Sequence, residues 1–143
     1  MQKPIWITPL TLEEVNFRSK NTLSDHLGIE FTEIGDDHLV ATMPVDPRTI
    51  QPMGLLHGGA TCALAETVGS AAANYCIDQT RKVCVGLDLN INHLRPVRSG
   101  MITGIARPFH LGKTTQVWEI KIYNELKQLT AISRLTMAVI DKN

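Results

Sequence analysis

Aromatic residues are scarce in this sequence, and neither sign of charge is in excess. Only 5% of the 143 residues are aromatic, and 14 Lys and Arg residues balance 14 Asp and Glu residues. A neutral chain with few aromatic rings has no electrostatic footprint for nucleic acid or for an anionic membrane surface. We therefore expect no nucleic acid and no membrane among its partners.

Cysteine is also sparse, and metal-ligand spacings are missing. The three cysteines, Cys62, Cys76 and Cys84, form no C-x-x-C unit, and the five histidines form no H-x-x-x-H unit, so we expect no metal. The start of the chain does not resemble a secretory leader, and no apolar run reaches the ~20 residues of a membrane span. These absences predict one cytoplasmic domain spanning residues 1–143.

Helical patterns are present in two parts of the chain. Thr11 and Glu14 form a T-x-x-E capping box, and Asn21 is expected to cap a second short helix, so that residues 1–27 hold two short helices. Residues 58–77 are rich in Ala, contain no Pro and are apolar almost all round. A helix of this kind is expected to be enclosed by the rest of the protein.

Alternating apolar and polar residues predict strands on either side of this helix. The predicted strands are residues 29–34, 38–45, 83–95, 101–110, 114–123 and 129–140. In the third of them Val85, Leu87, Leu89 and Ile91 are expected to share one face. The short connections at residues 96–100, 111–113 and 124–128 favour antiparallel hairpins between consecutive strands. The predicted class is α+β, with a sheet curled around one long helix.

A single carboxylate, Glu66, interrupts the apolar helix. Residues three, four and seven positions away share its face of the helix, and all of them are small: Gly59, Cys62, Ala63, Ser70 and Ala73. Burying an ionised carboxylate without a partner is costly. Glu66 is therefore either paired with a structural partner, such as an Arg or a second helix, or catalytic. Cys62 is a less suitable nucleophile because it lacks an adjacent base.

The start of the same helix has the sequence His57-Gly58-Gly59. Backbone N–H groups are free at a helix N-terminus, and glycine allows a ligand to approach them closely. This start is either a common glycine-rich turn or an oxyanion hole for a carbonyl under attack. A lipase-type site is excluded because the chain has no G-x-S-x-G motif.

The spacing of these two features predicts a dimer. Gly58 and Glu66 are eight positions apart, which is ~12 Å along a helix axis. One Glu side chain cannot cover that distance, so both residues can act on one carbonyl only if they come from different subunits. We therefore expect a two-fold homodimer with two shared sites.

The pattern Q-P-x-G-x-x-H-G-G-x(6)-E, from Gln51 to Glu66, resembles that of the acyl-CoA thioesterases of hotdog fold. The segments HLGI, MPVD and LNINHLRPV extend the resemblance over essentially the whole chain. The chain is similar to the 4-hydroxybenzoyl-CoA and phenylacetate-pathway thioesterases, and most of all to the 1,4-dihydroxy-2-naphthoyl-CoA thioesterases of menaquinone biosynthesis. The resemblance implies a hotdog fold, with a long central α-helix wrapped by a curved antiparallel β-sheet of five to six strands.

The resemblance also implies catalytic roles. Glu66 would act as the nucleophile or as the general base, and the Gly58 N–H would polarise the thioester carbonyl. Gln51 and His57 would lie nearby, and Ser70 would orient the carboxylate or a water molecule. No cofactor is implied, because coenzyme A is part of the substrate. This lineage usually forms a homotetramer of two dimers.

Coenzyme A itself would be held by residues after the third strand and in a later hairpin turn. By resemblance these are Gly86, His93, Leu94, Arg95, Pro96, His110, Leu111, Gly112, Lys113, Thr114 and Thr115. Arg95, Lys113 and Arg98 would suit the phosphate charges.

The implied function is hydrolysis of an aromatic or broad-range acyl-CoA. Small residues around Ser70, namely Gly69, Ala71, Ala72 and Ala73, leave room for an aromatic ring. The alternatives are a non-catalytic acyl-CoA-binding hotdog module, which needs no ionisable group on the central helix, and a hydratase, whose motif differs from H-G-G-x(6)-E.

Overall fold

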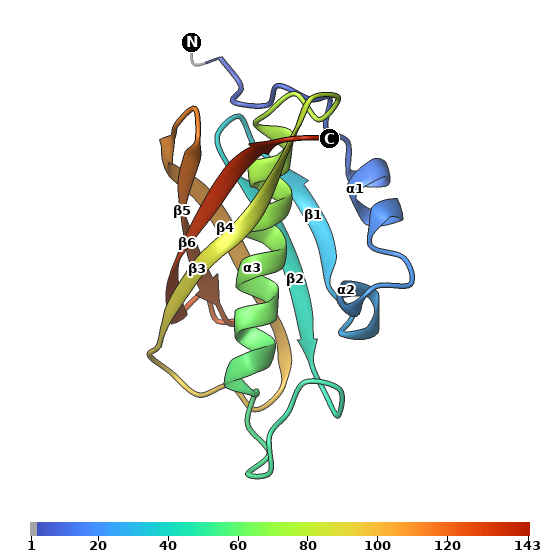
Figure 1. Ribbon diagram of the computed structural model, residues 1–143. Coiled ribbons are helices and arrows are strands. Elements are labelled where there is room, and N and C mark those ends of the chain that lie inside the picture. The colour runs from blue at the N-terminus through green and yellow to red at the C-terminus, as the bar shows by residue number, and fades with distance from the viewer. Residues whose placement is uncertain (1–2) are drawn as a thin grey trace.

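The computed structural model describes residues 3–143, in which six antiparallel strands curve around one long helix (Figure 1). The helix is α3, Gly58–Tyr75. The strands are β1 (Glu30–Ile34), β2 (Leu39–Val45), β3 (Lys82–His93), β4 (Gly100–Leu111), β5 (Thr115–Tyr123) and β6 (Leu129–Asp141). Their order in the sheet is β1-β2-β4-β5-β6-β3. The expected α+β class, with the sheet wrapped around the helix, is confirmed.

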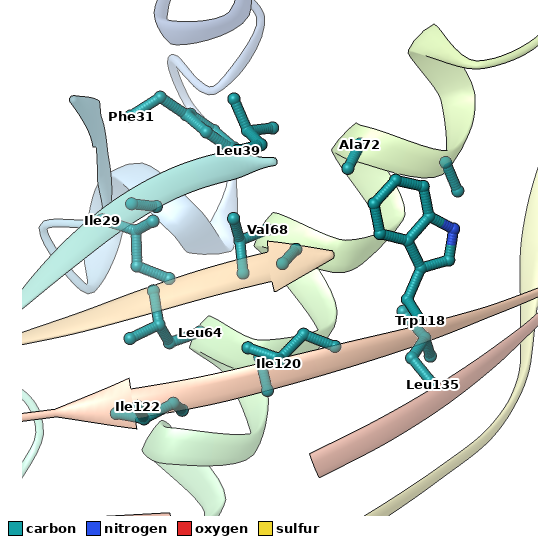
Figure 2. Close-up of a cluster of buried hydrophobic side chains, with 14 of the residues drawn as sticks. Ile29, Phe31, Leu39, Leu64, Val68, Ala72, Trp118, Ile120, Ile122 and Leu135 are labelled. Carbon is teal, nitrogen blue, oxygen red and sulfur yellow. The ribbon is translucent and has the colours of Figure 1, made fainter. Parts of the chain in front are cut away.

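One face of α3 forms the core together with the concave face of the sheet. Figure 2 shows Trp118 and Ile120 of β5 pointing toward α3, which contributes Leu64, Val68 and Ala72. All five side chains are fully buried. The buried indole N–H of Trp118 donates a hydrogen bond to the Gln116 side chain, 2.8 Å away, so its polar atom is satisfied.

The helix begins where the sequence predicts but ends two residues earlier than residue 77. Its N-cap is His57, whose Nδ1 accepts a hydrogen bond of 2.7 Å from the Gly59 N–H. At the other end, the Tyr75 carbonyl accepts from the N–H groups of Ile7 and Thr8, at 2.8 and 3.1 Å, and these bonds replace the next helical turn. Among residues 3–143, no helix is long and apolar enough to cross a membrane.

Two short helices precede the sheet, α1 (Leu12–Arg18) and α2 (Leu23–His26), and lie beside β1 and α3 (Figure 1). Thr11 caps α1 as predicted, because its hydroxyl accepts from the Glu14 N–H at 3.1 Å. The prediction for Asn21 is wrong. Thr22 precedes α2, and Asn21 adopts a φ of 62°, a left-handed conformation that Asn tolerates in turns. Residues 1 and 2 lie outside the described part.

The predicted hairpin between the third and fourth strands is also wrong. β3 pairs with β6, whereas β4 pairs with β2. The connection between β3 and β4 passes the start of α3, where the Leu56 N–H donates to the Val97 carbonyl at 2.7 Å. A short connection therefore joins two strands that are not neighbours, and β3 becomes an edge strand.

A bulge in β3 changes the face on which its apolar residues lie. The register shifts between Gly86 and Asp88, so one extra residue reverses the alternation. After the bulge Leu89 and Ile91 pack against the core, but before it Val85 is exposed, and Leu87 within it is 62% exposed. The expectation that all four share one face is wrong.

Candidate functional site

The first residue of α3 opens onto a cavity. Among the described residues the Gly58 N–H has no hydrogen-bond acceptor, as expected for the first position of a helix. The cavity has a volume of about 360 Å³, and Gln51, Thr61 and residues 93–97 line it together with Gly58. A Cβ atom on Gly58 would lie 3.1 Å from His93 Nε2. Glycine therefore keeps open the space between this N–H and the imidazole.

The residues before the helix form a closed loop at the same cavity. The Gln51 side-chain oxygen accepts a hydrogen bond from the Met53 N–H, and the Gln51 N–H donates to the Leu55 carbonyl at 2.8 Å. The side-chain NH2 of Gln51 has no acceptor among the described residues. Gln51 can thus donate to a bound substrate, whereas the His57 ring is occupied in part by capping the helix.

Glu66 lies outside the buried face of α3 and reaches the edge strand β3, beside Gly86. Its side chain is exposed, which contradicts the expectation that the chain itself encloses this helix on all sides. No ion pair or hydrogen bond to Glu66 occurs among residues 3–143, so the structural partner considered for it is missing from the protomer. One carboxylate oxygen lies 2.6 Å from the position that a Cβ on Gly86 would take. The glycine in β3 therefore makes room for this carboxylate.

Two other kinds of site were considered near Glu66, a thiol nucleophile and a group of metal ligands. Cys62 lies one turn before it, and burial together with the negative charge of Glu66 raises the pKa of the thiol. The thiol is held in its neutral, poorly nucleophilic form. In the described part of the chain, no three His, Cys, Asp or Glu residues are grouped as metal ligands.

Ser70 lies one turn after Glu66 on the same face of α3. It lines a second cavity, of about 460 Å³, between α3 and the two N-terminal helices. No hydrogen bond joins the Ser70 hydroxyl to Glu66 in the described structure. Its role in orienting the carboxylate therefore remains a prediction.

The two segments expected to hold coenzyme A lie at opposite ends of the sheet. On β6, Ala131 pairs with His93 and Ala138 pairs with Thr115. Seven residues of extended strand correspond to about 23 Å. Residues 93–96 lie beside the start of α3, whereas the turn of residues 110–115 lies near its other end (Figure 1). One protomer thus does not bring these segments together. Arg98 is exposed.

Sequence reasoning missed one residue of this face, Asn74. Its Oδ1 accepts from the Cys84 N–H at 2.9 Å, and its Nδ2 donates to the Cys84 carbonyl at 3.2 Å. The side chain therefore occupies the free backbone groups of the edge strand and fixes β3 against α3. The signal in the sequence was an Asn inside a helix, where its propensity is poor.

Comparisons with known proteins show the family to which the chain belongs. Residues 53–131 match the family model described as the thioesterase superfamily. The chain is 48% identical over 136 residues to the 1,4-dihydroxy-2-naphthoyl-CoA hydrolase of Escherichia coli K12, with 95% of this chain and 99% of that protein covered. It is 50% identical over 136 residues to the proofreading thioesterase EntH of Cronobacter turicensis, with coverage of 95% and 98%.

The fold is also similar to that of a thioesterase of known structure. The crystal structure of a thioesterase from Haemophilus influenzae superposes with a TM-score of 0.93 at 51% identity, covering 96% of this chain and 95% of the other. The family match spans more than half of the 143 residues, and the relatives at about half identity cover nearly all of them. The chain is therefore an enzyme that belongs to the thioesterase superfamily and has its hotdog fold.

Proposed function

We propose that this thioesterase hydrolyses acyl-CoA to the free acid and coenzyme A. One observation carries the proposal: α3 presents the exposed carboxylate of Glu66 and, at its start, the N–H of Gly58, and neither group has a hydrogen-bond partner among residues 3–143. A thioester needs these two groups, one to attack its carbonyl carbon or activate water and one to stabilise the oxygen. Two relatives, one named as a CoA hydrolase and one as a thioesterase, support it.

The chemistry follows from these roles. Glu66 either takes a proton from water, whose oxygen then bonds to the carbonyl carbon, or bonds to that carbon directly and forms an anhydride that water later hydrolyses. In both routes the Gly58 N–H donates to the oxyanion. The C–S bond breaks as the carbonyl re-forms, and the sulfur leaves as a thiolate that takes up a proton. Gln51, His57 and Ser70 would position the substrate or the water.

We propose a two-fold dimer as the unit that assembles the site. Asn74 occupies the backbone of Cys84, so the open edge of β3 begins at about Gly86 and continues to His93. Exposed Leu87 lies on this edge. Antiparallel pairing of two such edges would bring the start of one α3 toward Glu66 of the other. It would also bring the coenzyme A segments of the two chains, residues 93–96 and 110–115, to the same side.

The assembly is tested by measuring its mass by light scattering after gel filtration. The chain has a mass of 15.8 kDa, and we expect a particle of two chains, or of four if two dimers form the proposed homotetramer. Replacing Leu87 by Asp would place two like charges near the pairing edge. The variant should dissociate and lose activity together. A wild-type monomer that is fully active would contradict the dimer.

For the substrate we propose an aromatic acyl group, with 1,4-dihydroxy-2-naphthoyl-CoA of menaquinone biosynthesis in the cytoplasm as the first candidate. The name of the Escherichia coli relative supports this choice. A panel of aromatic and aliphatic CoA thioesters, compared by kcat/KM for thiol release, tests it. The naphthoyl ester should lead the panel. Equal turnover of all esters would instead indicate an enzyme that frees coenzyme A in general.

The same panel decides between an enzyme of this specificity and a binding module. If the purified protein bound the esters but released no thiol above the Glu66→Gln background, the proposed hydrolysis would be wrong.

A further inference from the structure

The cavity between α3 and the N-terminal helices is a continuation of the catalytic face. The residues of α3 that line it include Thr67, Ser70 and Asn74. They begin one residue after Glu66 and extend about 12 Å beyond it along the helix. The opposite wall comes from α1 and α2. A substrate whose carbonyl lies at Glu66 can therefore extend another part of itself into this space of about 460 Å³.

Three cationic side chains from distant parts of the chain line this cavity: Arg18 at the end of α1, Lys82 at the start of β3 and Lys142 after β6. Among the residues that the structure describes, no carboxylate lines it. One of the three charges is compensated, because Lys82 pairs at 2.6 Å with Asp141, which lies outside the lining. A partly enclosed space with an excess of positive charge favours an anion.

Arg18 is held in place by neutral groups. Its Nη1 donates to the Tyr75 hydroxyl at 3.2 Å and to Gln79 Oε1 at 3.0 Å, and the guanidinium lies 5.8 Å from the Tyr75 ring centre. No carboxylate forms an ion pair with it in the described part of the chain. Nε and Nη2 have no acceptor there, and these two adjacent nitrogens suit a carboxylate or phosphate.

We propose that this cavity binds a negatively charged oxygen group of the substrate and that Arg18 is the residue that selects for it. The inference rests on the proposed acyl-CoA hydrolysis. The charged group is a carboxylate or phenolate at the far end of the acyl chain, or a phosphate of coenzyme A. Both sources present the same chemistry to the guanidinium.

The test compares pairs of thioesters that differ by one charged group. Octanoyl-CoA and suberoyl-CoA have the same chain length, but the second carries a terminal carboxylate. Octanoyl-CoA and octanoyl-3′-dephospho-CoA differ by the ribose phosphate. The readout is the ratio of kcat/KM within each pair, for wild type, for Arg18→Leu and for Arg18→Lys. Lys20→Leu is the matched control, because Lys20 lies over Phe17 and outside the cavity lining.

We expect wild type to favour the more charged member of one pair and Arg18→Leu to reduce that ratio about tenfold, as for other charge-assisted hydrogen bonds. Arg18→Lys should keep part of the preference, and Lys20→Leu should keep all of it. A change in the suberoyl pair assigns the cavity to the acyl group, and a change in the phosphate pair assigns it to coenzyme A.

Unchanged ratios in both pairs would overturn the inference and leave the hydrolytic function intact. If wild type hydrolysed neither these esters nor any aromatic ester of the panel described above, the proposed function itself would fail, and the inference with it. Lys142→Ala provides a second variant that does not depend on the packing of α1. It should lower the same ratio as Arg18→Leu, by a smaller factor. If neither variant changed the ratio, the proposal would be contradicted. Thermal unfolding confirms that each variant is folded.

Discussion

The two faces of α3 differ in what they contain and in what they contact. The face toward the sheet carries Leu64, Val68 and Ala72, each fully buried. The opposite face carries Glu66 and Ser70. Glu66 is exposed and lies beside Gly86 of the edge strand β3, and Ser70 lines a cavity. One helix thus supports the fold on one side and presents the carboxylate and hydroxyl of the proposed site on the other.

A glycine on each side shows the same division. A Cβ on Gly69 would lie 2.7 Å from a methyl group of Leu135, so glycine there permits close packing of α3 against β6. A Cβ on Gly86 would lie 2.6 Å from the Glu66 carboxylate, so glycine there makes room for the side chain that we propose to be catalytic. We therefore expect changes on the two faces to affect different measurements.

The largest effect is expected on the outward face. Glu66→Gln keeps the size of the side chain but removes the base or nucleophile, and kcat should fall about 10³-fold or more. The midpoint of thermal unfolding should stay within a few degrees of wild type, because residues 3–143 offer this side chain no ion pair or hydrogen bond. A variant that kept most of its activity would remove Glu66 from the mechanism.

The matching change on the inward face is Leu64→Ala. It leaves a cavity between α3 and the sheet, and the free energy of unfolding should fall by about 2–5 kcal/mol. Urea unfolding measures this loss, and kcat per folded molecule should change little. A large loss of kcat with unchanged stability would show that the two faces are not separate in function.

Gly86→Ala sharpens the comparison with an intermediate effect. The added methyl group displaces the flexible end of Glu66, so kcat should fall about tenfold while stability changes little. Adding Glu66→Gln to this variant should then reduce activity less than it does in wild type, because the two changes disturb one group. If the activity losses of the two single variants simply added in the double variant, Gly86 would not act through Glu66.

The smallest effect concerns a region away from both faces, the turn between β1 and β2. The hydrogen bond to Asp37, 2.9 Å away, and that to Glu33 raise the pKa of His38. This stabilisation is fully present below the unfolded pKa of about 6.5 and disappears as pH rises through the higher folded value. His38→Gln should therefore destabilise the protein by no more than about 1 kcal/mol at pH 5 and not at pH 9.

Chemical denaturation at both pH values measures the His38 difference. A stability gap that grew as pH rose would contradict the assigned sign, and kcat should be unaffected at either pH.

Local patterns were sufficient to predict much of this molecule. The Thr11 cap, the start of the long helix and the positions of all six strands follow from periodicity and capping. The sequence also indicates that Glu66 is unusual, because a charge inside an apolar helix is costly. The exposure of Glu66 could not be predicted, because hydropathy does not show which side of a helix a sheet will cover.

Long-range features could not be predicted in this way. The pairing of β3 with β6 depends on the path of the chain past Val97 and not on the length of a connection. The bulge at Gly86 depends on the fit between two strands. Arg18 meets Tyr75 across 57 positions, and nothing in the local sequence of either residue indicates the contact.

In the proposed dimer, Glu66 of one subunit and the Gly58 N–H of the other act on one thioester. Gly58→Pro removes this N–H at a helix position that tolerates proline, and Gly58→Ala, which keeps the N–H, is its control. The direct test is to mix the Glu66→Gln and Gly58→Pro variants, let their subunits exchange, and measure thiol release. With random exchange, half of the dimers are mixed and each has one intact site, so thiol release should recover to about a quarter of the wild-type rate. A mixture no more active than its two inactive parents would contradict the account.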